Sequence, residues 1–162
     1  MIGMTRNIPS LHPGRVDSVQ ADALLKLDNQ LCFALYSTSL AMTRIYKPLL
    51  GKLDLTYPQY LAMLVLWERD GISVSALGER LYLDSGTLTP LLKRLEAAGW
   101  VTRLRAVDDE RRVHINLTAA GRKLKARAAT VPGCILAASQ CSIPELTQLT
   151  RQVQALRERL AA

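Results

Sequence analysis

The sequence has few residues of the kinds that hold together small secreted or metal-bound domains. Its 162 residues include three cysteines and two histidines, and aromatic residues make up 5%. A small, odd number of cysteines argues against a disulfide scaffold. The cysteine spacings do not fit a zinc site, and His12 and His114 lie far from any cysteine. We therefore expect neither a metal nor a cofactor.

Long apolar runs are also missing. No run approaches the roughly 18 residues of a membrane-spanning helix, and the strongest one, residues 61–67, is stopped by three charged residues. The first 15 residues lack the long apolar core of a signal peptide. They contain Pro9, Pro13 and Gly14, so residues 1–17 are expected to form a flexible arm. A cytoplasmic location, with no membrane partner, is the default expectation.

Leucine, alanine and positive charge are abundant instead. Apolar residues make up 49% of the chain, and the abundance of leucine and alanine favours helix over strand. The formal net charge is +7 and the pI is about 9.7. A basic balance indicates an anionic partner, most commonly nucleic acid, although solubility alone could also explain it.

Helical periodicity covers most of the chain. Apolar residues recur every three to four positions from Ala21 to Gly51, with Pro48 expected to kink or end that helix nearby. Helices follow at residues 57–67, which should be buried, and at residues 74–81. Another begins after Asp84 or Ser85 and ends before Gly99. Its leucines form a single core-facing stripe: Leu88, Leu91, Leu92 and Leu95.

A β-hairpin and further helices complete the pattern. Residues 100–105 and 112–117 read as two strands, the second with alternating apolar residues, joined by a polar tip. Thr118 then caps a helix that Pro132-Gly133 should break, and a second segment starts near Cys134. Ser142 and Glu145 have capping-box spacing. The final helix carries an apolar seam suited to another helix of the same subunit or of a partner: Leu146, Leu149, Val153, Leu156 and Leu160.

Two short helices, a tight turn and a hairpin are typical of a winged helix-turn-helix, so the predicted class is mainly α with a small β-hairpin wing. The face of the second helix opposite its leucines carries Ser85, Thr87, Thr89, Pro90, Lys93 and Arg94. Hydroxyls near a helix N-terminus suit phosphates and base edges. The hairpin supplies Arg103, Arg105, Arg111 and Arg112, and we interpret Asp109 as a brace for Arg111. The alternative is a solvated hairpin tip with balancing charges.

Several stretches of the sequence resemble a known family. Residues 84–96 with Gly99 and Asp109-Glu110-Arg111 resemble the MarR family of dimeric winged-helix regulators. Residues 31–36, 46–50 and 55–60 narrow the resemblance to its organic hydroperoxide-sensing branch, the OhrR-type repressors. The resemblance implies a homodimer that binds pseudo-palindromic double-stranded operator DNA until organic hydroperoxide releases it. It divides the chain into N-terminal dimerisation helices (18–52), a DNA-binding lobe (53–118) and C-terminal dimerisation helices (119–162).

The resemblance gives Cys32 a specific role. A lone helical cysteine is usually a small packing residue, but the family uses it as the redox sensor. Tyr36 lies one turn further along the helix and could donate to a thiolate. By resemblance, Tyr46 and Tyr57 are further donors, reaching Cys32 across the dimer interface.

Oxidation would give a sulfenic acid that a second thiol traps as an intersubunit disulfide. The chain offers Cys134 and Cys141 as candidates for this resolving thiol, although the family commonly places it near Ala137, a position that neither cysteine matches cleanly. They are seven residues apart and could share one face if the segment is helical. Cys141 is slightly favoured, because a thiol near a helix end can move more easily than one in a packed turn. Ordinary packing remains the alternative for both.

Other functions remain open. A thiol-dependent peroxidase would use Cys32 similarly, but it would want an arginine beside the cysteine, and the nearest in sequence is Arg44. A MarR-type repressor could instead be released by a small phenolic or lipid-like ligand. A basic architectural DNA binder would have no switch. We expect a regulator rather than an enzyme, because a peroxidase has no use for a wing.

Overall fold

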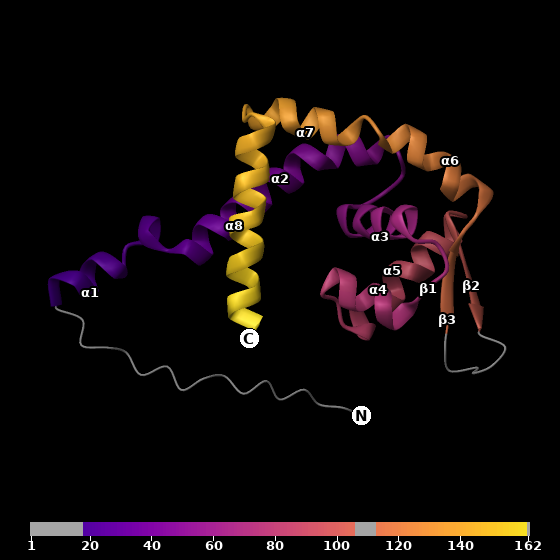
Figure 1. The fold of residues 1–162 in the computed structure, drawn as a ribbon, viewed down its shortest axis with the longest axis horizontal. Coiled ribbons are helices and arrows are strands. Elements are labelled where there is room, and N and C mark those ends of the chain that lie inside the picture. Colours follow the sequence, from indigo (N-terminus) through magenta and orange to yellow (C-terminus); the bar gives the residue numbers. More distant parts are fainter. Residues whose placement is uncertain (1–17, 106–112, 162) are drawn as a thin grey trace. The chain divides into compact units, whose positions relative to one another are not determined.

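The computed structural model describes residues 18–105 and 113–161, and the chain divides into two compact units, Met1–Ala41 and Met42–Ala162, with the boundary inside one long helix. The described elements confirm a mainly helical fold with a small sheet (Figure 1). In order they are α1 (Ser18–Leu24), a 3-10 turn (Leu27–Asn29), α2 (Leu31–Gly51), α3 (Tyr57–Glu68), β1 (Ile72–Ser73), α4 (Val74–Leu81), α5 (Ser85–Ala97), β2 (Val101–Arg105), β3 (Val113–Leu117), α6 (Ala119–Ala128), α7 (Val131–Ser139) and α8 (Ile143–Ala161).

The N-terminal unit corrects the prediction of one continuous helix from Ala21. The chain leaves helical geometry after α1, where polar side chains take up the free carbonyl groups of its last turn. Asn29 Nδ2 donates to the Ala23 carbonyl at 2.7 Å, and Gln30 Nε2 donates to the Leu24 carbonyl. Because α2 starts afresh at Leu31, Cys32 lies in its first turn.

The join between α2 and α3 follows the prediction. Pro48 lies inside α2, which ends three residues later at Gly51. Thr56 begins α3 through a capping box in which its backbone N–H donates to Gln59 Oε1 at 2.8 Å. As expected, α3 is buried on most sides, and Ala62, Met63 and Leu66 have no exposed surface.

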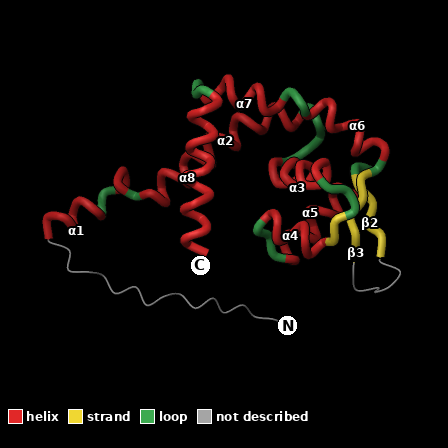
Figure 2. Tube along the Cα trace, viewed as in Figure 1, coloured by secondary structure: helices red, strands yellow, loops and turns green. Residues whose placement is uncertain are grey.

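The sheet has three antiparallel strands in the order β1-β3-β2, which Figure 2 colours yellow beside the helices. Strands β2 and β3 form the predicted hairpin, with Val101 opposite Leu117 and Arg105 opposite Val113. The sequence did not predict β1, where Ile72 pairs with Ile115. Two residues are too few to show the alternation that identifies a strand.

One core joins the end of α2 to α3, α4, α5, the sheet, α6 and α7. The four leucines of α5 are 0–7% exposed, which confirms their predicted stripe. Asp84 and Gly99 bound this helix as predicted: the Asp84 side chain accepts from Thr87 N, and Gly99 has a φ of +77°. The second helix of the helix-turn-helix is therefore held firmly by its inner face.

The C-terminal helices differ from the prediction in where they break. Pro132-Gly133 does not end a helix, because Pro132 lies in the first turn of α7, where its missing N–H costs nothing. The break falls at residues 129–130 instead. The predicted capping box at the start of α8 is present, with Ser142 N donating to Glu145 Oε2 at 2.6 Å.

Helix α8 has no buried residue, although Arg157 places its guanidinium carbon 4.5 Å from the Tyr82 ring centroid. Across the part of the chain that the structure describes, every helix is too short or too polar to cross a membrane.

Candidate DNA-binding and thiol sites

The outer face of α5 is fully presented to solvent. All six residues predicted to contact DNA from this helix are exposed, while the leucines behind them are buried: Ser85, Thr87, Thr89, Pro90, Lys93 and Arg94. The hydroxyls lie in the first turns and the cations further along. The helix therefore offers small polar groups and positive charge on one surface, as a groove-binding helix requires.

Asp84 fixes the start of this face. Its Oδ1 accepts from the Thr87 backbone N–H at 2.9 Å, and its Oδ2 accepts from the Thr87 hydroxyl at 2.9 Å. These hydrogen bonds to Thr87 hold the pKa of the Asp84 carboxyl below its usual range. The hydroxyl of Thr89 is also engaged, donating to the Ser85 carbonyl at 2.7 Å. The helix start is thus preorganised by its own side chains.

The described part of the wing holds two of the predicted arginines. Arg103 is ion-paired with Glu96 at the end of α5, at 2.7 Å between Nη2 and Oε2, and its Nε donates to the same oxygen. The pair ties the wing to α5. Arg105 is exposed at the end of β2. Asp109, Arg111 and Arg112 lie outside the described residues, so the predicted brace between Asp109 and Arg111 remains a prediction.

Cys32 is exposed in the N-terminal unit, so it does not serve as a packing residue within this unit. Its neighbour one turn on, Tyr36, is 62% exposed. The first helical hydrogen bond of α2 runs from Ala34 N to the Gln30 carbonyl at 3.0 Å. Cys32 therefore precedes the regular hydrogen-bonding pattern, among N–H groups that have no intrahelical partner.

Two predicted phenols come together in the second unit. The rings of Tyr46 and Tyr57 lie 4.6 Å apart between centroids, and Tyr60 lies 6.0 Å from Tyr46. Burial, with the neighbouring phenols Tyr57 and Tyr60, raises the pKa of Tyr46 to about 12, and burial also raises the pKa of Tyr57. Both hydroxyls therefore keep their protons near neutral pH. We had not predicted Tyr60, although its spacing of three from Tyr57 places both on one side of α3.

The other two cysteines do not share a helix face. Cys134 is exposed in α7, but α7 ends at Ser139 and Gln140 has a φ of +54°. Cys141 thus lies in the link to α8, where its Sγ donates to the Ser139 carbonyl at 3.3 Å. The predicted packed turn around Cys134 is also wrong, since the residue lies in a helix. Cys141 does precede the cap of α8, as predicted.

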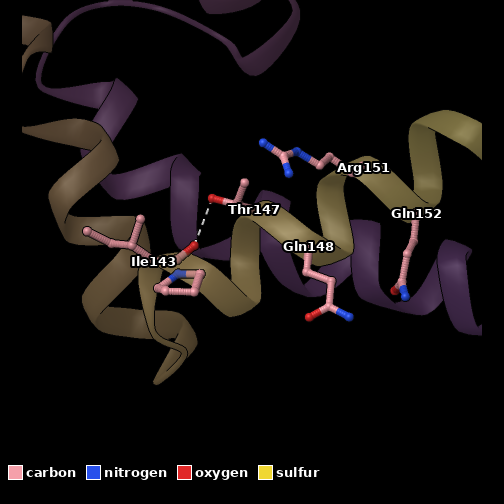
Figure 3. Close-up of a pocket in the computed structure, with 6 residues that line it drawn as sticks. Ile143, Thr147, Gln148, Arg151 and Gln152 are labelled. Atoms are coloured by element: carbon pink, nitrogen blue, oxygen red, sulfur yellow. Dashed lines mark hydrogen bonds between the residues drawn. The ribbon is translucent and has the colours of Figure 1, made fainter.

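The predicted seam of α8 is largely uncovered, with only Leu146 and Leu156 half-buried. Leu149, Val153 and Leu160 are 51%, 47% and 78% exposed. The start of the helix carries a shallow hollow lined by α8 alone (Figure 3), from Ile143 through Thr147 and Gln148 to Arg151 and Gln152. The Thr147 hydroxyl in this hollow already donates a hydrogen bond to the Ile143 carbonyl, at 2.8 Å. This is an open helix surface rather than an enclosed ligand cleft.

Comparisons with known proteins agree on one class. The family model of the transcriptional regulators SarA and Rot matches residues 44–128. A Bacillus subtilis organic hydroperoxide resistance transcriptional regulator is 54% identical over 136 residues, which cover 84% of this chain and 92% of that protein.

Among solved structures, reduced AbfR bound to DNA is 35% identical with a TM-score of 0.66, covering 85% of this chain and 97% of that one. Disulfide-formed AbfR is 34% identical with a TM-score of 0.59, covering 89% and 96%.

The helix-turn-helix, its exposed polar face and these relatives define a winged-helix transcriptional regulator of the MarR family. Within that family, the chain belongs to the organic hydroperoxide-sensing branch, the OhrR type.

Proposed function

We propose that this protein is a redox-sensing repressor rather than an enzyme, acting on DNA in the cytoplasm. Its reduced homodimer binds a pseudo-palindromic operator, and organic hydroperoxide releases it by oxidising Cys32. One observation carries the proposal. Cys32 is exposed at the start of α2 in a chain 54% identical to an organic hydroperoxide resistance regulator.

The chemistry needs no cofactor. The Cys32 thiolate attacks an oxygen of the hydroperoxide, the O–O bond breaks, and the leaving alkoxide takes a proton to become an alcohol. The sulfur is oxidised to a sulfenic acid and the peroxide is reduced. A second thiol then displaces the hydroxyl as water and forms a disulfide. Cys141 or Cys134 of a second copy supplies this thiol.

Phenol groups stabilise the thiolate. We propose Tyr36 as a donor from the same helix, with Tyr46 and Tyr57 contributed by the second copy. Their support is the close approach of the Tyr46 and Tyr57 rings, 4.6 Å between centroids, which brings two phenol donors together. AbfR structures in the reduced, DNA-bound form and the disulfide form show that a relative at about one third identity exists in both states.

Two lobes of a dimer would read the operator. In each lobe, covering residues 53–118, the exposed face of α5 enters the major groove while Lys93, Arg94 and the wing arginines contact the DNA. Helices in residues 18–52 and 119–162 form the dimer, and the uncovered seam of α8 supports this arrangement. Successive major grooves lie about 34 Å apart, so a disulfide that changes the lobe spacing releases the DNA.

The test is a gel shift with palindromic operator DNA, with and without organic hydroperoxide, followed by non-reducing electrophoresis. The wild-type protein should bind when reduced and be released as a cross-linked dimer forms. Cys32→Ser should bind equally well and stay bound. The matched controls, Cys134→Ser and Cys141→Ser, should identify the resolving thiol by loss of the cross-link. Release of Cys32→Ser by hydroperoxide would refute the proposal.

A further inference from the structure

Helix α6 is the covalent link between the wing and the segment that holds the two other cysteines. Thr118 caps α6 directly after β3, with Gly121 N donating to its hydroxyl at 2.9 Å. At the other end, two residues separate α6 from α7, which carries Cys134 and leads to Cys141. Along the chain, a movement imposed at either cysteine reaches the wing through α6, while in space Val131 and Ile135 of α7 also pack into the core.

Polar contacts fasten α6 to the end of α3. Arg122 Nη2 lies 2.6 Å from Asp70 Oδ2, and Lys125 Nζ donates to the Trp67 carbonyl at 3.1 Å. In return, Trp67 Nε1 donates to the Gly121 carbonyl at 2.9 Å. Two cations thus lie at the end of α3, where free carbonyl groups and the helix dipole favour positive charge.

The Asp70 carboxylate extends the same connection to the wing. While its Oδ2 accepts from Arg122, its Oδ1 accepts from Leu117 N at 2.8 Å and from Gly71 N at 2.9 Å. Leu117 is the last residue of β3. One carboxylate therefore holds α6, the end of β3 and the turn before β1 in a fixed relation.

Two more contacts complete the attachment. Arg127 Nη2 donates to the Lys52 carbonyl just beyond the end of α2, at 2.5 Å. Gly121 of α6 lies so close to Trp100 that a Cβ atom on it would be 2.1 Å from the Trp100 carbonyl oxygen. The first turn of α6 therefore packs directly against the residue that joins α5 to the wing. These contacts reach the ends of α2, α3 and α5.

We propose that Arg122, Lys125 and Arg127 are positioning residues that make α6 move together with the DNA-binding lobe, so that disulfide formation displaces the lobe rather than only α7. The inference rests on the proposed redox function. All three side chains belong to exposed residues, and exposed ion pairs add little to folding stability. Leu124 and Ala128 already pack α6 into the core, so we assign to the three cations the orientation of α6 on the lobe rather than the stability of the fold.

The test replaces the three cations together, with glutamine at Arg122, Lys125 and Arg127. We measure disulfide formation on non-reducing gels, operator Kd in the reduced and oxidised states, and Tm. The triple variant should form the cross-link at the wild-type rate, while its ratio of oxidised to reduced Kd falls at least about fivefold. Loss of charge weakens DNA binding in both states, and the ratio cancels that general effect.

Three single variants complete the test. Lys123→Gln is the control, because it removes a cation of the same helix whose side chain has no hydrogen bond or ion pair to another described residue. Its ratio should match the wild type. Arg122→Gln should lower the ratio of oxidised to reduced Kd, and Arg122→Lys should restore part of it. These two variants also test the proposal if the triple variant does not fold. An unchanged ratio in Arg122→Gln and in the folded triple variant would overturn the inference. Wild-type protein that stays on DNA after oxidation would instead overturn the proposed function.

Discussion

Helices α5 and α8 carry nearly the same sequence pattern, but the apolar face of α5 is buried within the chain and that of α8 is largely exposed. Both repeat apolar residues every three or four positions, and both begin with a side-chain cap. In α5, the four leucines of the stripe are at most 7% exposed, whereas in α8 Leu149 and Val153 are about half exposed. The lobe around α5 is complete within one chain, and α8 is not.

The difference shows what periodicity can and cannot predict. A repeat of three and four residues predicts that one helix face avoids water, but it does not say which surface covers that face. For α5 the chain supplies α3, α4 and the sheet. Within the described chain the seam of α8 stays largely exposed, and we propose that a second copy covers it. The following predictions test this contrast between α5 and α8.

The largest expected effect comes from truncating one leucine in each helix. Leu92→Ala should lower the free energy of unfolding by about 2–5 kcal/mol at every protein concentration, because it leaves a cavity in the lobe. Leu149→Ala should instead act through association and weaken the dimer. Urea unfolding at two protein concentrations separates the two effects. If Leu149→Ala proves as costly as Leu92→Ala, independent of concentration, the contrast is wrong.

The polar faces of α5 and α8 should contribute differently to DNA binding. Lys93→Ala on α5 should weaken operator binding and lower the slope of log affinity against log salt by about 0.9, as expected for one lost phosphate contact. Arg159→Ala on α8 removes the same charge far from the recognition face along the sequence and should leave the slope unchanged. Fluorescence anisotropy at several salt concentrations gives both slopes. Equal slope changes would show that net charge alone controls binding.

Alkaline pH should weaken the phenol cluster at the end of α2 and in α3. Tyr46 titrates near 10.0 in its ordinary state, and burial raises its pKa to about 12 in the fold. Its contribution to stability is therefore complete below about pH 10 and is lost as the pH rises toward 12. Tyr46→Phe should flatten the fall of Tm over that range. Tyrosinate absorbance that rises fully near pH 10 in the folded protein would contradict this.

The smallest expected effect is a change in thermal stability at acid pH that comes from the caps of α5 and α8. Hydrogen bonds to Thr87 lower the pKa of Asp84, and hydrogen bonds to Ser142 lower the pKa of Glu145. Each carboxylate stabilises its helix above its ordinary pKa, and that contribution is lost as the pH falls through the lowered value. Asp84→Asn and Glu145→Gln should each reduce the loss of Tm between pH 5 and pH 3. An acid transition identical to wild type in both variants would contradict the cap assignment.

Much of the DNA-binding lobe was predictable from the sequence, because its capping residues and apolar patterns indicate the same helices and strands that pack in the fold. The leucine stripe, the Asp84 cap, Gly99 and the alternation in β3 all indicate the same helix and hairpin. The errors fall where side chains act over longer distances. Asn29 and Gln30 end α1 by bonding to its carbonyls, which apolar periodicity does not record. Pro132 starts a helix instead of ending one, because proline fits either place.

The candidate site was predicted less completely. Resemblance alone identified Tyr46 and Tyr57, and the structure brings their rings together. Spacing also suggested that Cys134 and Cys141 share a face, and the left-handed Gln140 between α7 and Cys141 excludes this. The Asp70–Arg122 pair spans 52 positions, and such contacts leave no periodic signal in one sequence. The Asp70–Arg122 pair becomes visible only in the folded structure.

The uncovered seam of α8 has a consequence for the abundance of the protein. A 19-residue helix without any buried side chain gains little from its own chain. If α8 pairs between two copies, as proposed, the unpaired helix should fray and be open to proteases when few copies are present, whereas pairing should protect it. We therefore expect a scarce repressor to be degraded sooner than an abundant one.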